Sequence, residues 1–324
     1  MDAIIAYELT KNYDQIPALR GINLTVPQGS ALACVGPLAS GKTSLIRLLC
    51  GLVKPSAGEC SVMGLSPVHE AKRLHGLMGT ALTSSRLYNT MSLFDNLRFF
   101  AGLYGIERSA AAQRVSFLMR RLGLWEDRDK RPYTLPTGVL RRAGLCRALV
   151  HSPRVLLIDE DGDGMDLETA GRVKEMLCYV KEEEGVTLFL CTRDMDYAQQ
   201  VMESFKEPGL YALLHQGALI ARGELESLRL SRGVRLKAAL RIKDGDKAPE
   251  GFRLEDGLWQ REIGGEQEMP GLISKAVESG VGLYEARLIR PSLSRIYQAY
   301  LDVGQTIMQK EAPADGQHPE EAKQ

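Results

Sequence analysis

Residues 36–43 read Gly36-Pro37-Leu38-Ala39-Ser40-Gly41-Lys42-Thr43, and this stretch decides the fold of the chain. It fits the pattern G-x-x-x-x-G-K-[ST] of a phosphate loop, in which small residues let successive backbone N–H groups curve around nucleotide phosphates. Lys42 supplies a positive charge for the β- and γ-phosphates, and the Thr43 hydroxyl is a ligand for Mg²⁺. A glycine-rich turn without a ligand is the alternative, but chance matches to the pattern are rare. The phosphate loop therefore predicts nucleotide binding.

The residues on either side of the phosphate loop fit the same interpretation. Residues 31–35 are an apolar run typical of a buried strand, and residues 44–50 read as a helix. The N-terminus of that helix adds a partial positive charge beside the phosphates. The predicted nucleotide-binding residues are Gly36, Pro37, Leu38, Ala39, Ser40, Gly41, Lys42, Thr43 and Ser44.

A second apolar run, residues 155–158, ends in Asp159 and Glu160. Such a run suits a central parallel strand, and carboxylates at its C-terminal end lie where α/β sheets place their ligand chemistry. We expect Asp159 to hold Mg²⁺, together with Thr43, and Glu160 to polarise the attacking water. The alternative is that the two carboxylates cap the next helix, predicted at residues 166–180.

Composition limits the remaining classes of function. The formal net charge of the 324 residues is zero, which gives no case for nucleic-acid binding. Hydrophobic residues make up 44% of the chain, but no apolar run is long enough to span a bilayer, and residues 1–8 lack the features of a signal peptide. We therefore expect a cytoplasmic protein. The six cysteines form no C-x-x-C pair, which favours reduced thiols over a metal site or disulfides.

Periodicity gives the other elements. Strands are predicted at residues 3–13, 22–26, 31–35, 59–63, 77–82, 155–158 and 186–192, the last as the final core strand. Helices are predicted at residues 44–50, 92–100 with a Ser92 N-cap, 110–122, from Gly138 to 150, and 166–180. Tyr13 ends the first strand, where its ring either stacks on an adenine or is a half-buried strand residue.

These segments together resemble the nucleotide-binding subunit of ATP-binding cassette (ABC) transporters, in the export branch whose ATPase pairs with separate permeases. The resemblance covers residues 3–304. It is carried by the phosphate loop, Gly58, Leu87-Tyr88, the 155–166 segment, Thr192-Arg193-Asp194, and the stretches 97–105, 145–149, 214–217 and 291–293.

The resemblance implies an α/β fold, that of a P-loop NTPase of the ABC ATPase type. Its nucleotide-binding domain is expected at residues 1–228, with a helical subdomain at about 84–150. Residues 229–304 read as a small C-terminal α+β domain, and residues 305–324 as a disordered tail. The implied partners are a second ABC ATPase subunit and an integral-membrane permease, which would hold the protein at the inner face of the cell membrane.

The sequence departs from the family pattern at four places. Thr83 replaces the Gln of the Gln loop, Arg193 replaces the switch His, and Asp161 replaces the Pro after Glu160. The signature segment, residues 135–139, reads Leu-Pro-Thr-Gly-Val, with Pro136 in place of the Ser that contacts a γ-phosphate across the dimer. These changes predict weak or partner-dependent hydrolysis.

The retained motifs and the departures from the family pattern leave three possible functions. The first is an ATPase that drives export through a permease, and the second is a non-hydrolysing regulatory or structural half of a heterodimer. A cassette protein acting on ribosomes or DNA is the third, disfavoured by the single cassette and the neutral charge. The permease is expected to dock around residues 83–100, with Leu87 and Tyr88 at the interface and Phe94 in the core of the helical subdomain.

Overall fold

The computed structural model describes residues 1–82, 87–160 and 166–311, with side chains up to Asp302. The chain separates into two compact units, Met1–Leu225 and Glu226–Gln324. Among the described residues, no helix is both long enough and apolar enough to cross a membrane.

A six-stranded sheet forms the centre of the first unit, in the order β5-β6-β7-β3-β8-β9. All neighbouring strands are parallel except β8 and β9. Every residue of β3 and β7 is buried, as expected for strands covered on both faces. The strands are β3 (Ala31–Val35), β5 (Met78–Leu82), β6 (Val155–Glu160), β7 (Thr187–Thr192), β8 (Leu210–His215) and β9 (Ala218–Gly223).

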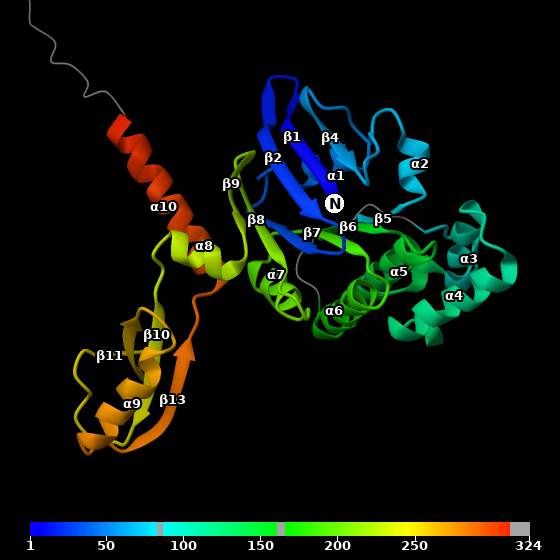
Figure 1. Cartoon of the computed structure of the whole chain (residues 1–324). Helices are drawn as coiled ribbons and strands as arrows, with labels where there is room; N and C mark the ends of the chain where they lie inside the picture. The colour runs from blue at the N-terminus through cyan, green and yellow to red at the C-terminus, as the bar shows by residue number, and fades with distance from the viewer. Residues whose placement is uncertain (83–86, 161–165, 312–324) are drawn as a thin grey trace, which may run out of the picture. The chain divides into compact units, whose positions relative to one another are not determined.

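A smaller antiparallel sheet lies above the first one in Figure 1, in the order β2-β1-β4. It contains β1 (Asp2–Tyr13), β2 (Ile16–Pro27) and β4 (Ala57–Val62). Helix α1 (Lys42–Leu49) packs against both sheets, and its buried Leu45 and Leu49 join Leu24, Leu157 and Phe189 in one core. The short helix α2 (Ala71–His75) precedes β5.

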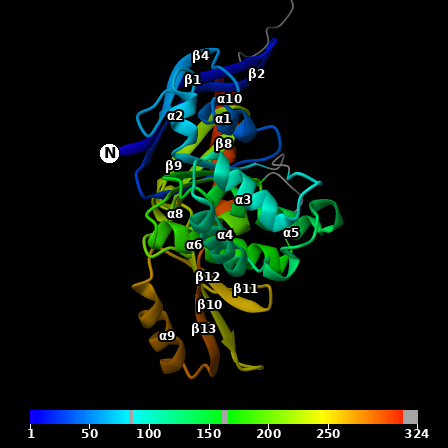
Figure 2. The ribbon, with the colours of Figure 1, turned by 90° about the vertical axis from the view of Figure 1, so that its right-hand side faces the viewer.

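Three helices are grouped beside β5 (Figures 1 and 2): α3 (Leu93–Leu103), α4 (Arg108–Arg121) and α5 (Thr137–Leu149). The predicted N-cap is confirmed, because the Ser92 hydroxyl accepts a hydrogen bond of 3.1 Å from the Asp95 N–H. Two short 3₁₀ turns, η1 (Trp125–Asp127) and η2 (Pro132–Thr134), connect α4 to α5.

Helices α6 (Leu167–Glu182) and α7 (Met195–Met202) cover the face of the large sheet opposite α1 (Figure 1). Our expectation that residues 186–192 form the final core strand is wrong. Strand β8 follows α7, pairs with β3, and buries Tyr211 to Leu214 completely or nearly so.

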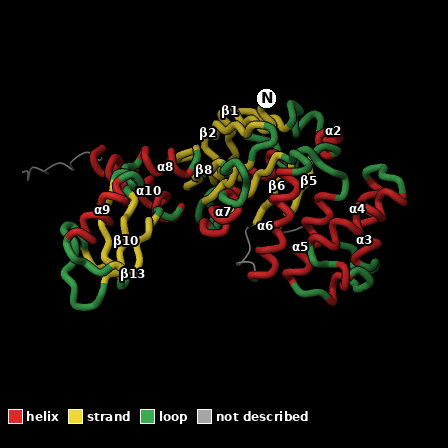
Figure 3. Tube along the Cα trace, turned by 60° about the horizontal axis from the view of Figure 1, so that its bottom comes forward, coloured by secondary structure: helices red, strands yellow, loops and turns green. Residues whose placement is uncertain are grey.

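The second unit is an antiparallel sheet with helices. Its strand order is β11-β12-β10-β13, and in Figure 3 its strands lie side by side with α9 along them. The elements are α8 (Leu225–Ser231), β10 (Leu236–Ile242), β11 (Arg253–Glu255), β12 (Leu258–Ile263), α9 (Glu268–Glu278), β13 (Leu283–Ile289) and α10 (Leu293–Glu311). Leu236, Leu240, Phe252, Ile263 and Ala276 form its core.

The predicted disordered tail, residues 305–324, falls partly on α10. This helix runs past residue 304 to Glu311, and the next helix-breaking residue in the sequence is Pro313. Residues 312–324 lie outside the described residues.

Candidate nucleotide-binding site

The phosphate loop joins β3 to α1, as predicted, and its backbone admits no side chain at two positions. Gly41 has φ of +106°, and a Cβ there would lie 2.5 Å from the Ala18 carbonyl oxygen. A Cβ at Gly36 would lie 2.1 Å from the Leu214 carbonyl oxygen. Both contacts are too short for real atoms, so the tight curve of the loop depends on glycine at both ends.

The side chain of Lys42 lies inside this curve and is only 3% exposed. Its Nζ donates to the carbonyl oxygens of Gly36 and Pro37, at 2.9 and 2.8 Å, and to the Ser40 hydroxyl at 3.2 Å. A buried cation held by neutral oxygens gains from an anionic partner, because charge-assisted hydrogen bonds are about twice as strong as neutral ones. The loop therefore fits a phosphate group.

The register of the central sheet brings the predicted site residues to one edge. Asp159 pairs with Leu82 on one side and with Cys191 on the other. Glu160 pairs with Thr192, and Thr192 pairs with Val35, the residue before the phosphate loop. The phosphate loop, the two carboxylates and residue 193 thus leave the sheet side by side. Thr83 and Asp161 lie outside the described residues.

Asp159 faces the α1 side of the sheet and is 8% exposed. Burial, and secondly the negative charge of Asp159, raise the pKa of Cys50 at the end of α1 to about 12. Burial is also the main cause that raises the pKa of Cys191; Asp159 adds to it, and the charge of Lys42 opposes it. The charges of Asp159 and Lys42 are therefore both close to Cys191, near the end of β7. The Thr43 hydroxyl and the Asp159 carboxylate are both oxygen ligands of the kind that Mg²⁺ prefers.

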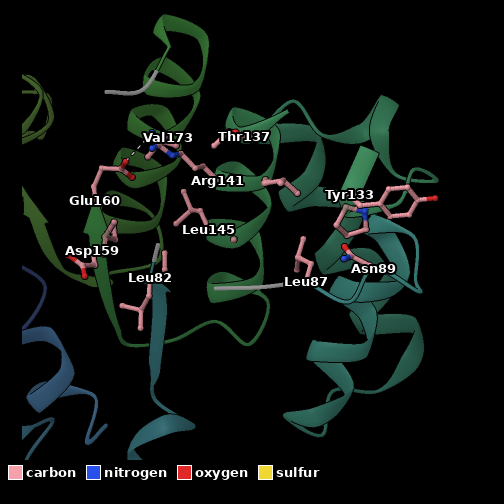
Figure 4. Close-up of a pocket in the computed structure, with 15 residues that line it drawn as sticks. Leu82, Leu87, Asn89, Tyr133, Thr137, Arg141, Leu145, Asp159, Glu160 and Val173 are labelled. Carbon is pink, nitrogen blue, oxygen red and sulfur yellow. Dashed lines mark ion pairs between the residues drawn. The ribbon is translucent and has the colours of Figure 1, made fainter. Parts of the chain in front are cut away.

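Glu160 faces the other side of the sheet, because successive residues of a strand point to opposite faces. There it forms an ion pair with Arg141 of α5, with 3.2 Å between Arg141 Nη1 and Glu160 Oε1 (Figure 4). The Glu160 and Arg141 side chains are 19% and 24% exposed. Sequence reasoning missed Arg141, because no local pattern connects α5 to the end of β6.

The capping alternative for Asp159 and Glu160 is wrong. The N-cap of α6 is Asp166, whose carboxylate accepts a hydrogen bond of 2.8 Å from the Thr169 N–H. The hydrogen bond from the Thr169 N–H is the main cause that lowers the pKa of Asp166. The helix is therefore capped without Asp159 or Glu160, and both carboxylates remain candidates for chemistry.

The signature segment forms the start of α5. Pro136 stands at the N-cap position and provides no side-chain cap, whereas a Ser there would have a hydroxyl to offer. A Cβ at Gly138 would lie 2.5 Å from Thr169 Oγ1 and 2.6 Å from Asp166 Oδ2. Gly138 therefore allows the first turns of α5 and α6 to approach closely. Arg193 follows β7 and is exposed.

Tyr13 ends β1 in the antiparallel sheet. Its side chain is 37% exposed, and the Lys11 Nζ lies 5.1 Å from the centre of its ring. Both readings of this residue fit that exposure, so its stacking on an adenine stays a prediction.

A cavity of about 490 Å³ lies beside the two carboxylates (Figure 4). Described residues that line it include Leu82, Leu87, Asn89, Tyr133, Arg141 and Glu160. It thus extends from the predicted permease-docking segment to the Arg141–Glu160 ion pair.

The predicted docking segment is held in place by a residue that sequence reasoning missed. The fully buried Asn96 accepts a hydrogen bond of 2.7 Å from the Tyr88 N–H and donates to the carbonyl oxygens of Tyr88, Met91 and Ser92. The Tyr88 ring is 49% exposed and lies 5.5 Å from the Phe99 ring. Phe94 is half-buried against Trp125, with ring centres 6.3 Å apart.

Comparison with known proteins agrees with this geometry. Residues 19–161 match the family model described as ABC transporter. A solved structure of the ATP binding subunit of an ABC transporter has the same fold, with a TM-score of 0.65 and 22% identity, over 72% of this chain and 94% of that one.

Three curated proteins illustrate the range of similar sequences. The ABC transporter ATP-binding protein NatA of Bacillus subtilis is 28% identical over 66% of this chain and 84% of NatA. The probable multidrug ABC transporter ATP-binding protein YbhF of Escherichia coli is 29% identical over 70% of this chain, which spans only 38% of the length of YbhF. The methionine import ATP-binding protein MetN of Symbiobacterium thermophilum is 31% identical over 70% of this chain and 68% of MetN. The chain therefore belongs to the family of ATP-binding proteins of ABC transporters.

Proposed function

We propose that this chain binds MgATP on its phosphate loop, closes on a second ABC ATPase subunit, and drives export through a separate membrane permease. The observation that carries the proposal is the buried Lys42, enclosed by a loop that needs glycine at positions 36 and 41. Family membership supports the same function, because ABC ATPase domains bind ATP and work as dimers on permeases.

Each site residue has a separate part in this function. The N–H groups of residues 36–44 and the Lys42 ammonium bind the phosphates, and the Tyr13 ring stacks on the adenine. Thr43 and Asp159 would hold Mg²⁺, and Glu160 accepts a proton from the attacking water. When bound, Mg²⁺ would neutralise negative charge that develops on the phosphates.

Direction of transport rests on the stretches that resemble the export branch, residues 97–105, 145–149, 214–217 and 291–293. The names of similar proteins differ on this point, since YbhF is a probable multidrug type and MetN an import type. Uptake of substrate by inverted vesicles that contain the chain and its permease tests direction. ATP-dependent release from such vesicles would contradict export.

A regulatory half of a heterodimer is the second candidate. It is favoured by Pro136, which leaves the N-cap of α5 without a side-chain oxygen, and by Arg193 in place of the switch His. ATP hydrolysis by the purified chain separates the candidates, because the regulatory half binds ATP without turning it over.

The proposed location is the inner face of the cell membrane, where the permease holds the chain. Leu87 lines the cavity and Tyr88 is half exposed, so both are accessible to a permease segment. Fractionation with and without the permease tests this attachment.

A further inference from the structure

We propose that Arg141 is a positioning residue that restrains ATP hydrolysis by holding the Glu160 carboxylate against α5. The inference rests on the proposed role of Glu160 as the proton acceptor. Arg141 lies outside the phosphate loop, and loss of its guanidinium is predicted to speed ATP hydrolysis.

The ion pair itself is well placed to hold Glu160. Arg141 Nη1 and Glu160 Oε1 are 3.2 Å apart, and both side chains are more than three-quarters buried. Water screens such a pair less than it screens a surface pair, so the attraction is stronger than for the exposed ion pairs of this chain. One partner lies on α5 and the other at the end of β6, which makes the pair a link between two elements (Figure 4).

The ion pair holds Glu160 on the side of the sheet away from the groups that would bind the phosphates. Asp159 and Lys42 lie toward α1, whereas Glu160 points to the face covered by α5, α6 and α7. A carboxylate that serves a water beside the phosphates must turn toward the phosphate loop. It must therefore leave Arg141 first.

The surroundings allow the pair to open. Arg141 and Glu160 both line the cavity of about 490 Å³, so either side chain has space to move without repacking the core.

The test is steady-state MgATP hydrolysis by the full chain and a set of variants. Arg141→Gln removes the charge, Arg141→Lys retains it, and Arg141→Met keeps only the apolar stem. Arg172→Gln is the matched control, because Arg172 pairs with Glu175 on the surface of α6 at 3.8 Å. We expect Arg141→Gln and Arg141→Met to raise kcat about three- to tenfold while KM for ATP changes less than about twofold. Arg141→Lys is expected to stay near wild type, and Arg172→Gln to have no effect.

The double variant Arg141→Gln/Glu160→Gln separates this inference from the proposed function. If Arg141 acts through Glu160, the gain disappears in the Glu160→Gln background. A gain that persists there would mean that Arg141 does not act through Glu160, and the inference fails. Turnover by Glu160→Gln alone at the wild-type rate would mean that Glu160 is not the proton acceptor, and the proposed role of that residue fails. If Glu160→Gln abolishes turnover but both Arg141 variants are no faster than wild type, only the inference fails. Absence of turnover in every protein, with binding of an ATP analogue intact, likewise overturns the restraint by Arg141. Thermal unfolding of each variant confirms that it is folded.

Discussion

The ammonium group of Lys42 donates a hydrogen bond of 2.9 Å to the carbonyl oxygen of Gly36, the first residue of the phosphate loop. The cation and the start of the loop are thus tied together. Replacing Lys42 therefore removes both the charge that would face a phosphate and a bond that shapes the loop.

We expect Lys42→Ala to weaken binding of a fluorescent ATP analogue by about 10- to 100-fold, since loss of a charge-assisted contact costs about 1.5–3 kcal/mol. Titration by fluorescence measures this. Lys54→Ala is the control, because Lys54 is exposed and is not among the predicted nucleotide-binding residues. Equal affinity of Lys42→Ala and wild type would remove the basis of the proposed nucleotide site.

Gly41→Ala is expected to reduce both ATP binding and the melting temperature. Its φ of +106° disfavours any side chain, and the new Cβ would lie 2.5 Å from the Ala18 carbonyl oxygen. Gly102→Ala is the matched control on α3, where a Cβ meets nothing within 4 Å and alanine favours the helix. Thermal unfolding with and without ATP should separate the two variants, and equal melting temperatures would contradict the prediction.

The purified chain is expected to hydrolyse ATP more slowly than the range of about 1–100 per second that is typical of kinases. The slow hydrolysis is expected from four replacements of family residues, at Pro136, Thr137, Arg193 and Thr83. Phosphate release at saturating MgATP measures the rate. Pro136→Ser restores a hydroxyl to the start of α5 and should increase turnover when a partner subunit supplies the opposite site. A wild-type rate within the quoted range would rule out the regulatory function.

Tyr88→Asp is expected to release the protein from membranes that contain its permease and to leave ATP binding unchanged. The ring is half exposed beside Phe99, where a charge would oppose an apolar interface. Membrane fractionation measures the effect. The control is Tyr284→Asp, because Tyr284 is an exposed tyrosine of the second unit. A fully membrane-bound Tyr88→Asp would refute docking at this segment.

Stability should fall as the pH drops from 6.5 toward 4, in part through His151. Desolvation by burial lowers the pKa of His151 from 6.5 to about 4. The unfolded chain then takes up a proton before the folded one does, so stability is complete above pH 6.5 and declines below it. The ring is also stacked on Tyr104 at 3.8 Å, and its Nε2 lies 3.2 Å from the Met78 carbonyl oxygen.

Thermal unfolding of wild type and His151→Gln between pH 7 and pH 5 measures this contribution. The variant cannot acquire a charge, so its melting temperature should depend less on pH. His69→Gln, at an exposed position, is the control. An identical pH dependence of all three proteins would show that His151 contributes nothing.

The phosphate loop and the Asp159–Glu160 strand end could be predicted because each is a short, continuous pattern with one structural solution. Strand β2 was predicted only from residue 22 and begins at Ile16, because Pro17 and Gly21 read as strand breakers. At Gly21 the strand has φ of +62°, and the pairing of β1 with β2 is shifted at several points. Bulges of this kind accommodate residues that propensity excludes.

Arg141 and Asn96 were missed for a different reason. Arg141 reads as a solvated helix residue, and Asn96 as an ordinary polar position on α3. Their roles come from partners that tertiary packing supplies, namely Glu160 for Arg141 and the backbone of residues 88–92 for Asn96. Periodicity assigns a residue to an element but does not identify its partner on another one.

The close approach at Gly138 also matters for protein engineering. Pro136 and Thr137 are exposed, so a library that randomises the start of α5 samples them without disturbing the interior. A Cβ at position 138 would lie 2.5 Å from Thr169 Oγ1 and 2.6 Å from Asp166 Oδ2, so any other residue there would displace the side chains that begin α6. Libraries aimed at raising ATP turnover should therefore vary residues 136 and 137 and keep glycine at 138.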